Sequence, residues 1–253
     1  MKIVISPAKS LDFETKLPTS KYSVPAFLTE SERINKVLAK KSPRSLMRLM
    51  DISTQLAEVN WERNQHFQLP FTPDNARPAI YAFNGDVYLG LDAYSIPEEK
   101  IEKMQDSLRI LSGLYGMLKP LDLIQPYRLE MGTSLKIGRK KNLYEFWRTT
   151  LTKALNEELE EGEMLVNLAS NEYFSALESK KIKGPIITPV FKDWKNDKLK
   201  VLSFFAKKAR GSMVRYLIDS NAQTLDDIRG FTGNDYQFSK EHTLREHQPV
   251  FIR

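Results

Sequence analysis

Short apolar runs along the chain predict strands, and longer stretches with apolar residues three or four apart predict helices. Residues 2–5 are β-branched and end at Ser6-Pro7, which indicates a short buried strand. Residues 194–197 separate two further apolar runs and predict a hairpin. The strands expected from these patterns lie at 2–5, 80–83, 164–168, 186–191, 199–206 and, as an edge strand, 249–252.

Capping residues predict where the helices begin. Thr29 with Glu32 and Ser95 with Glu98 have the spacing of a capping box, and Asn142 has Glu145 three residues later. Ser42 precedes a proline, which favours a first helical turn. The expected helices run over about 30–41, from Pro43, from Asp51 to about His66, over 97–111, from Asn142 to about Glu161, from Ser170 briefly, and from Gly211 to about Ser220.

This mixed order of elements predicts a single compact α+β domain over residues 1–253. No regular strand–helix alternation requires a doubly wound sheet, and no repeat or polar linker separates two cores. The chain is long enough to bury a substantial core. Its 41% hydrophobic and 28% charged residues exclude wholesale disorder.

Composition also excludes several kinds of site. The chain has no cysteine, so disulfides, thiolate metal sites and cysteine nucleophiles are excluded. With only three histidines, we expect no metal site and no cofactor. There is no apolar run of about 18 residues and no signal-peptide core, so we expect a cytoplasmic protein without a membrane partner.

Positive charge is concentrated in one segment. Residues 195–215 hold seven Lys or Arg and one Asp, a surplus of six that equals the net charge of the whole chain. A second basic segment at 136–148 is largely offset by five glutamates at 157–163. The surplus is compatible with nucleic acid or phosphate as a partner.

The centre of the first basic segment predicts an anion site. Lys207, Lys208 and Arg210 directly follow a β-rich run, and cations beside free N–H groups at a strand-to-helix junction bind phosphate well. Gly211 indicates a tight turn or a close approach at the same place. The alternative is a hairpin whose lysines only face water.

Two Gly-x-x-Gly segments resemble a helix-hairpin-helix element, in which backbone N–H groups contact a DNA phosphate. The first contains Gly113, Tyr115 and Gly116 after the helix at 97–111, with Lys119 at its edge. The second contains Gly230 and Gly233. The same spacing is also common where a helix simply ends.

Three polar clusters supply candidates for chemistry. Arg128 and Glu130 share one face of an extended segment, as an ion pair or as part of a site. Glu172 follows the strand expected at 164–168, and the carboxyl end of a strand is a usual site location. Lys9 lies three residues after Ser6, which allows a nucleophile and a base or simply a turn.

Five long blocks resemble the YaaA family and occur in the order typical of it. They are ISPAKSLDF at 5–13, FNGDVYLGL at 83–91, SGLYGMLKPLDLIQPYRLEMG at 112–132, NLASNEYF at 167–174 and FFAKKARGSMVRY at 204–216. Within them lie Lys9, Tyr115, Lys119, Tyr127, Arg128, Glu130, Lys207, Lys208 and Arg210. The stretch after about residue 239 departs most from the family pattern.

The resemblance implies resistance to hydrogen peroxide, through low intracellular iron. It also implies a compact α+β fold with a positively charged cleft and a helix-hairpin-helix element suited to DNA. No established reaction comes with it. We expect a monomer.

Three functions remain open at this stage. The first is non-sequence-specific DNA binding through a basic cleft, using Lys9, Gly113, Tyr115, Gly116, Lys119, Arg128, Lys207, Lys208 and Arg210. The second is an enzyme for a small anionic or nucleotide-like substrate in the same cleft, with Glu130, Glu172 or Lys9 as catalytic groups. The third, direct iron binding, is disfavoured because the chain lacks the ligands.

Overall fold

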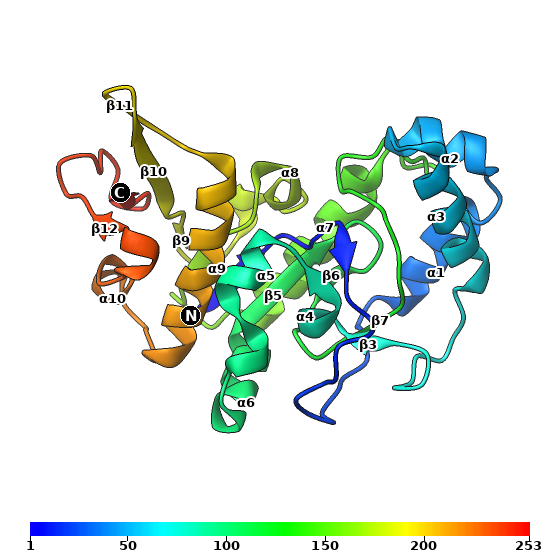
Figure 1. Cartoon of the computed structure of the whole chain (residues 1–253), viewed down its shortest axis with the longest axis horizontal. Coiled ribbons are helices and arrows are strands. Elements are labelled where there is room, and N and C mark those ends of the chain that lie inside the picture. Colours follow the sequence, from blue (N-terminus) through cyan, green and yellow to red (C-terminus); the bar gives the residue numbers. More distant parts are fainter.

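A five-stranded sheet crosses the middle of the molecule in the computed structural model, which describes residues 1–253 (Figure 1). Its order is β6-β5-β1-β8-β9. The central strand β1 (Lys2–Ile5) pairs in parallel with β5 (Leu108–Ser112) and with β8 (Leu165–Asn167). β9 (Ile186–Ile187) continues the parallel arrangement, and β6 (Gly116–Leu118) is antiparallel at the other edge.

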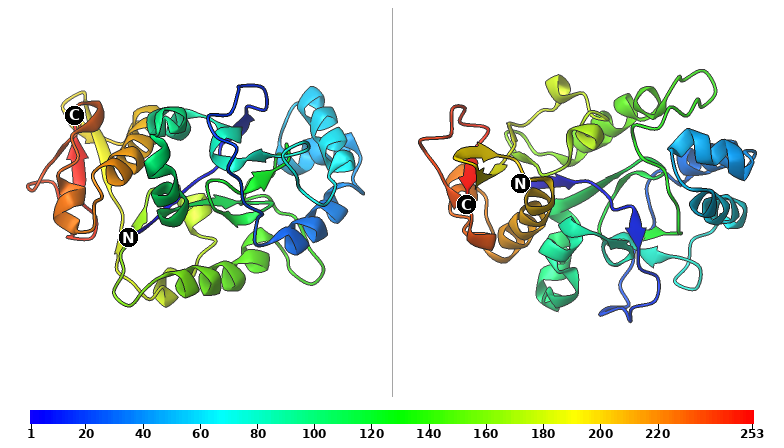
Figure 2. Two further views of the ribbon diagram at one scale, coloured as in Figure 1. Left: turned by 90° about the horizontal axis from the view of Figure 1, so that it is seen from below. Right: turned by 45° about the horizontal axis from the view of Figure 1, so that its top comes forward.

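Helices cover both faces of this sheet, which explains why its central strands are almost entirely buried. The long helix α7 (Leu143–Glu158) lies on one face, and α5 (Asp86–Leu91), α6 (Glu98–Ser107) and α9 (Ser203–Asp219) lie on the other (Figure 2, left). The buried side chains form one connected hydrophobic cluster of 61 residues, with Trp147 among the largest.

Two lobes extend from the central sheet. On the right of Figure 1, α1 (Leu28–Leu38), α2 (Pro43–Met50) and α3 (Thr54–His66) pack together. On the left, a second sheet has the order β11-β10-β13-β12. Its elements are β10 (Val190–Lys195), β11 (Lys198–Lys200), β12 (Gln237–Phe238) and β13 (Val250–Ile252), joined by α10 (Leu225–Arg229).

Short elements complete the fold. β2 (Ser10–Leu11) pairs with β4 (Phe83–Asn84), and β3 (Arg77–Pro78) pairs with β7 (Leu123–Ile124). The remaining short helices are α4 (Ala79–Ala82), α8 (Asn171–Phe174) and three 3₁₀ turns, η1 (Ala93–Ser95), η2 (Ser179–Lys181) and η3 (Gly233–Asp235). The mixture of parallel and antiparallel sheets with helices confirms the predicted α+β class. None of the helices has the length and apolar composition needed to span a membrane.

The sequence patterns placed some elements correctly and misplaced others. Ser42 and Asn142 cap α2 and α7 as predicted. The capping box at Thr29 is wrong, because α1 begins at Leu28 and its N-cap position is Phe27. Asp51 ends α2 in a left-handed conformation, and Ser53 caps the next helix instead.

Three predicted strand or helix boundaries are also wrong. The apolar run 80–83 is mostly helical, in α4, because tertiary packing overrides the local β preference of a short run. The helix expected over 97–111 ends at Ser107, and the apolar residues after it enter the central sheet as β5. β13 lies between β10 and β12, so the last strand is interior rather than at an edge.

The basic segment differs most from its prediction. Asn196 and Asp197, both with positive φ, form the turn of the predicted hairpin. However, α9 begins at Ser203, eight residues before the predicted start, so the apolar residues before the lysines are helical. Lys207 to Arg210 therefore lie inside the helix and not at a strand-to-helix junction with free N–H groups.

Helices α5 and α9 cross at backbone contact, through one glycine from each. A Cβ on Gly211 would lie far inside van der Waals contact of the Val87 carbonyl oxygen, and one on Gly90 would meet the Lys208 carbonyl oxygen in the same way. Gly211 thus marks a close approach, as predicted, but the approaching group is another helix and not a ligand.

Replacing Gly211 with alanine is expected to destabilise the protein by at least about 2 kcal/mol, since neither backbone can move away cheaply. Urea denaturation monitored by circular dichroism measures the change. Lys208→Ala, on the same helix but exposed, serves as the control and should change stability by less than about 0.5 kcal/mol. Equal stability of Gly211→Ala and the parent would contradict the tight crossing.

Candidate functional site

A pocket of about 400 Å³ lies where β1 and β8 end. We call it the switch-point pocket. Residues that follow β1, β4 and β8 line it together with α9 and the loop after β7. The polar and charged side chains in its lining are Ser6, Lys9, Ser10, Asn84, Asp86, Tyr88, Glu130, Ser170, Glu172, Tyr173, Lys207 and Arg210.

The topology of the sheet explains why a pocket forms there. From the carboxyl end of β1 the chain leads to β5 on one side, and from that of β8 it leads to β9 on the other. Connections that diverge from two adjacent parallel strands leave a crevice at their carboxyl ends, the usual ligand position in open α/β sheets. The pocket thus lies at the position where this sheet topology favours a ligand site.

Arg210 is the cation in the pocket without a partner. Its side chain is half-buried and makes no ion pair or hydrogen bond within the protein. Burial lowers the pKa of its guanidinium, and no neighbouring carboxylate offsets that effect. Lys207, one helical turn earlier, is exposed and likewise unpaired. An anion entering the pocket would supply the missing counter-charge.

The other cation, Lys9, is already paired. Its Nζ lies 2.8 Å from Oε2 of Glu130, whose Oε1 lies 3.4 Å from a terminal nitrogen of Arg128. Glu130 therefore bridges the two cations, which confirms the predicted Arg128–Glu130 proximity. Nε of Arg128 is buried and has no hydrogen-bond partner.

Glu172 is positioned from two sides. Its Oε1 accepts a hydrogen bond of 2.9 Å from the backbone N–H of Gly132, and Tyr144 donates its hydroxyl to the Glu172 carbonyl oxygen. The adjacent Tyr173 is buried, and its pKa is raised by burial and then by Tyr127, Glu172 and Glu130. Glu130, Glu172 and Tyr173 all line the same pocket.

Ser6 and Lys9 do not form a nucleophile and base. Oγ of Ser6 accepts the Ser170 N–H at 2.9 Å and lies 3.3 Å from the Ser170 hydroxyl, while Lys9 is bound to Glu130. The hydroxyl of Tyr88 donates to the Ser6 carbonyl oxygen at 3.0 Å. These bonds fix the turn that follows β1, which favours the turn interpretation of Ser6.

The first predicted helix-hairpin-helix is wrong. Gly113 and Tyr115 form the turn between β5 and β6, and this β-hairpin is buried throughout. The Gly113 carbonyl oxygen accepts the indole N–H of Trp147, and the Tyr115 hydroxyl donates to the Gln125 carbonyl oxygen. A Cβ on Gly116, which has a φ of +72°, would collide with Trp147. These groups are therefore inaccessible to DNA.

Lys119 and Tyr127 also lie outside the switch-point pocket. Lys119 lines a separate cavity of about 240 Å³ beside Arg109, Asp122 and Glu158. The hydroxyl of Tyr127 is buried at 2.7 Å from that of Ser112. The structure thus brings Lys9, Glu130, Glu172, Lys207 and Arg210 together and leaves Lys119 apart.

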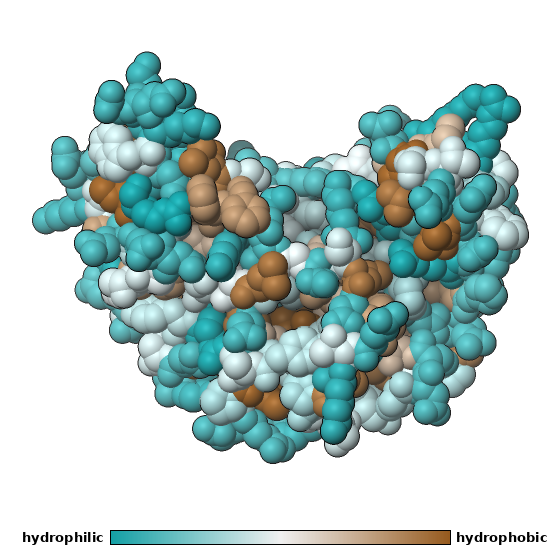
Figure 3. Space-filling model, viewed as in Figure 1, coloured by the Kyte–Doolittle hydropathy of each residue, from teal (hydrophilic) through white to brown (hydrophobic).

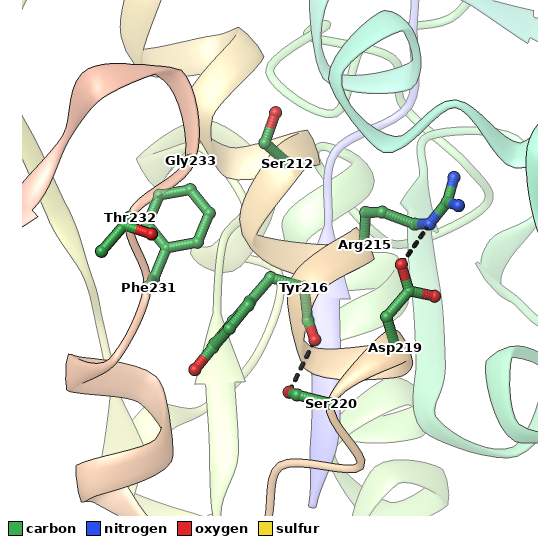
Figure 4. Close-up of a pocket in the computed structure, with 8 residues that line it drawn as sticks. All are labelled: Ser212, Arg215, Tyr216, Asp219, Ser220, Phe231, Thr232 and Gly233. Carbon is green, nitrogen blue, oxygen red and sulfur yellow. Dashed lines mark hydrogen bonds and ion pairs between the residues drawn. The ribbon is translucent and has the colours of Figure 1, made fainter.

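The second Gly-x-x-Gly segment borders a surface groove of about 490 Å³ between α9 and residues 231–233 (Figure 4). The Gly230 N–H is bonded to Asp226 and Asp227 carbonyl oxygens, so it ends α10 and is not free for a phosphate. Arg215 in this groove pairs with Asp219 at 2.6 Å. The groove therefore has no unpaired cation.

Exposed cations without an ion pair occur on both lobes. Figure 3 shows a hollow at the top of the molecule between them, with β11 and the start of α9 on the left side and α2 and α3 on the right (compare Figure 1). On the left lobe, the exposed lysines without an ion pair include Lys195, Lys198, Lys200, Lys207 and Lys208. Phe204 and Phe205 lie exposed among them.

The right lobe carries a basic segment that the sequence reasoning missed. Residues 40–48 hold four cations and no acid, namely Lys40, Lys41, Arg44 and Arg48. None of them forms an ion pair, and all but the half-buried Lys41 are exposed. The charge count used on residues 195–215 would have found this segment as well.

When the chain is compared with known proteins, its sequence matches one family over nearly its whole length. Residues 1–242 fit the family model described as peroxide stress protein YaaA. The chain belongs to the YaaA peroxide stress protein family. It is 62% identical to a UPF0246 protein of Flavobacterium johnsoniae over the full length of both chains. A relative in Flavobacterium psychrophilum is 60% identical over 96% of this chain and 98% of its own length.

Another relative, from a Marinomonas strain, is 51% identical over all of this chain and 97% of its own. The structure contains no group of three or more His, Asp or Glu residues placed to hold a metal ion.

Replacing Glu130 with glutamine is expected to lower the free energy of unfolding by about 1 kcal/mol at low salt. Arg128, whose side chain is only 17% exposed, then loses its carboxylate, whereas the loss at Lys9 is screened by water. Denaturant titrations at two salt concentrations measure the effect. Glu157→Gln, which breaks an exposed pair at 3.8 Å, is the control, and an equal loss in both variants would contradict the role of Glu130.

Proposed function

We propose that this YaaA protein binds DNA without sequence specificity, across the hollow between its two lobes, and that this binding is its part in peroxide stress resistance. The observation that carries the proposal is the set of unpaired, exposed cations on both sides of the hollow. Lysines that face water without a carboxylate partner keep their full charge for a phosphate backbone.

Two features favour a non-sequence-specific mode. Lysine acts as a flexible point charge, which contacts phosphates without reading base edges. The β10–β11 hairpin and α2 also project their cations from separate lobes, so a polyanion that spans the hollow meets both. The exposed Phe204 and Phe205 add faces on which bases can stack where the duplex opens.

Binding to duplex DNA should weaken as salt rises, and removing cations should reduce that dependence. For Lys195→Gln/Lys198→Gln/Lys200→Gln, the slope of log affinity against log salt is expected to fall by up to about 2.7, because each phosphate contact contributes about 0.9. Arg44→Gln/Arg48→Gln should reduce the slope by up to about 1.8. Fluorescence anisotropy with a labelled duplex of arbitrary sequence measures both.

The control removes two lysines that are paired elsewhere on the surface. Lys153→Gln/Lys181→Gln breaks exposed ion pairs with Glu157 and Glu178 and should leave DNA affinity unchanged. Absence of duplex binding by the parent protein at low salt would overturn the proposal.

A second candidate function is an enzyme that acts on a small anionic substrate in the switch-point pocket. The specific observation in its favour is that Glu130, Glu172 and Tyr173 line one pocket, which also holds Arg210. Two carboxylates beside a bound anion can serve as general acid and base.

This second function is tested by turnover. The protein is incubated with a panel of nucleotides and sugar phosphates, and phosphorus NMR follows any change. Turnover by the parent that is lost in Glu172→Gln would support the enzyme function. The variant must have the same unfolding temperature as the parent, so that the loss is not due to unfolding. If no compound of the panel is converted, the enzyme function is contradicted, and the DNA-binding proposal is unaffected.

A further inference from the structure

The charges inside the switch-point pocket are separated into two ends. At one end, Glu130 pairs with Lys9 and with Arg128, and Glu172 lines the same pocket, so two carboxylates face two cations there. No carboxylate pairs with Arg210 at the other end, and Lys207 lies one helical turn away from it on α9. The α9 end therefore carries two cations that the protein leaves without counter-charge.

We propose that the switch-point pocket binds a phosphomonoester, with its phosphate against Arg210 and Lys207 and its hydroxyl-bearing part toward Glu130 and Glu172. The inference rests on the second proposed function for its location, but it concerns binding and does not require turnover. The ligand class is a phosphorylated polyol, such as a nucleoside monophosphate or a terminal phosphate on a DNA strand.

The phosphate position follows from charge and geometry. A guanidinium binds two phosphate oxygens through a planar fork, and a lysine adds a mobile point charge. Arg210 is half-buried, so its attraction to a dianion is less screened by water than that of an exposed lysine. The Asp86 carboxylate also lines the pocket, which makes a ligand with hydroxyl donors a better fit than a bare polyanion.

The carboxylate end fits sugar hydroxyls. Carboxylates accept hydrogen bonds from hydroxyl groups, and an acidic residue beside a ribose is a recurrent feature of nucleotide sites at this position of α/β sheets. Glu172 is held by the Gly132 N–H and Glu130 by two cations, so each carboxylate is already oriented before the ligand arrives.

Pocket size separates this ligand from duplex DNA. A volume of about 400 Å³ is in the range that suits a small ligand and is too small for a phosphodiester that carries a nucleotide on each side within a duplex. The exposed lysines on the lobes and the pocket therefore serve different ligands, although Lys207 contributes to both surfaces.

The test compares Lys207→Gln with Lys208→Gln. The two lysines are adjacent on α9 and both exposed, but only Lys207 lines the pocket. Isothermal titration calorimetry with AMP is expected to show about tenfold weaker binding for Lys207→Gln, the loss of one charge-assisted contact. Lys208→Gln should bind AMP like the parent while losing affinity for duplex DNA.

Further ligands define the chemistry. Adenosine should bind the parent at least tenfold more weakly than AMP, since it lacks the phosphate. Comparing a 5′-phosphorylated single strand with its 5′-hydroxyl counterpart shows whether a strand end is the natural source of the phosphate. A preference for AMP over adenosine, or for the phosphorylated strand over the hydroxyl strand, supports phosphomonoester binding. Arg210→Gln, checked for folding by circular dichroism, should abolish the preference for AMP over adenosine.

The outcomes separate this inference from the proposed functions. Equal affinity of the parent for AMP and adenosine, or equal losses in the two lysine variants, would overturn the inference whatever the DNA result. AMP binding without any turnover of the panel would overturn only the enzyme. If the parent protein binds AMP but does not bind duplex DNA, only the DNA proposal is overturned.

Discussion

The backbone contact between α5 and α9 is the constraint on which the rest of the site depends. Gly90 and Gly211 let the two helices approach until only hydrogen atoms fit between them. Since α5 begins directly after β4, this contact fixes α9 relative to the strand ends. The position of Arg210, next to Gly211, is therefore set by a steric contact and not by a charge pair. A guanidinium held in this way can remain without a counter-ion, because the packing of its neighbours supplies the stability that a salt bridge does not.

The sequence predicted the chemistry of the site better than its geometry. Lys9, Glu130, Glu172, Lys207 and Arg210 come from four of the five blocks, and residues of all five blocks line one pocket. Lys9 and Glu172 were chosen because they follow predicted strands, Glu130 because it shares an extended segment with Arg128, and Lys207 and Arg210 because of the local surplus of positive charge. All of these are properties of the local sequence. The start of α9 was predicted wrongly because Phe204 and Phe205 have a strong local β preference. In the protein they lie in the first turn of a helix whose other face packs on α5. Tertiary contacts of this kind have no signature in a short window of residues.

The glycine pattern shows why the hairpin prediction failed. Gly113 and Gly116 have the spacing of a DNA-contacting hairpin, but spacing does not report burial. Their hairpin is covered by α7, whose Trp147 donates to the Gly113 carbonyl oxygen and blocks the space beside Gly116. Gly116 is needed because the Trp147 indole occupies the place where a side chain would be, and Gly113 is needed because the Leu129 carbonyl oxygen occupies the corresponding place beside it. The apolar residues between and after them, all buried, were the better indicator.

Unpaired charge connects these observations to function. A protein selected only for stability would pair or expose its cations, since a half-buried guanidinium without a partner opposes folding. Here the pairs are made elsewhere: Arg109 with Glu158, Arg215 with Asp219, and Arg253 with Asp193. Carboxylates are thus available to the fold and are used, yet none reaches Arg210 or the lysines of the left lobe. Because the same chain pairs these arginines and leaves the half-buried Arg210 without an ion pair or hydrogen bond, Arg210 is best explained by an anion that the protein meets in use.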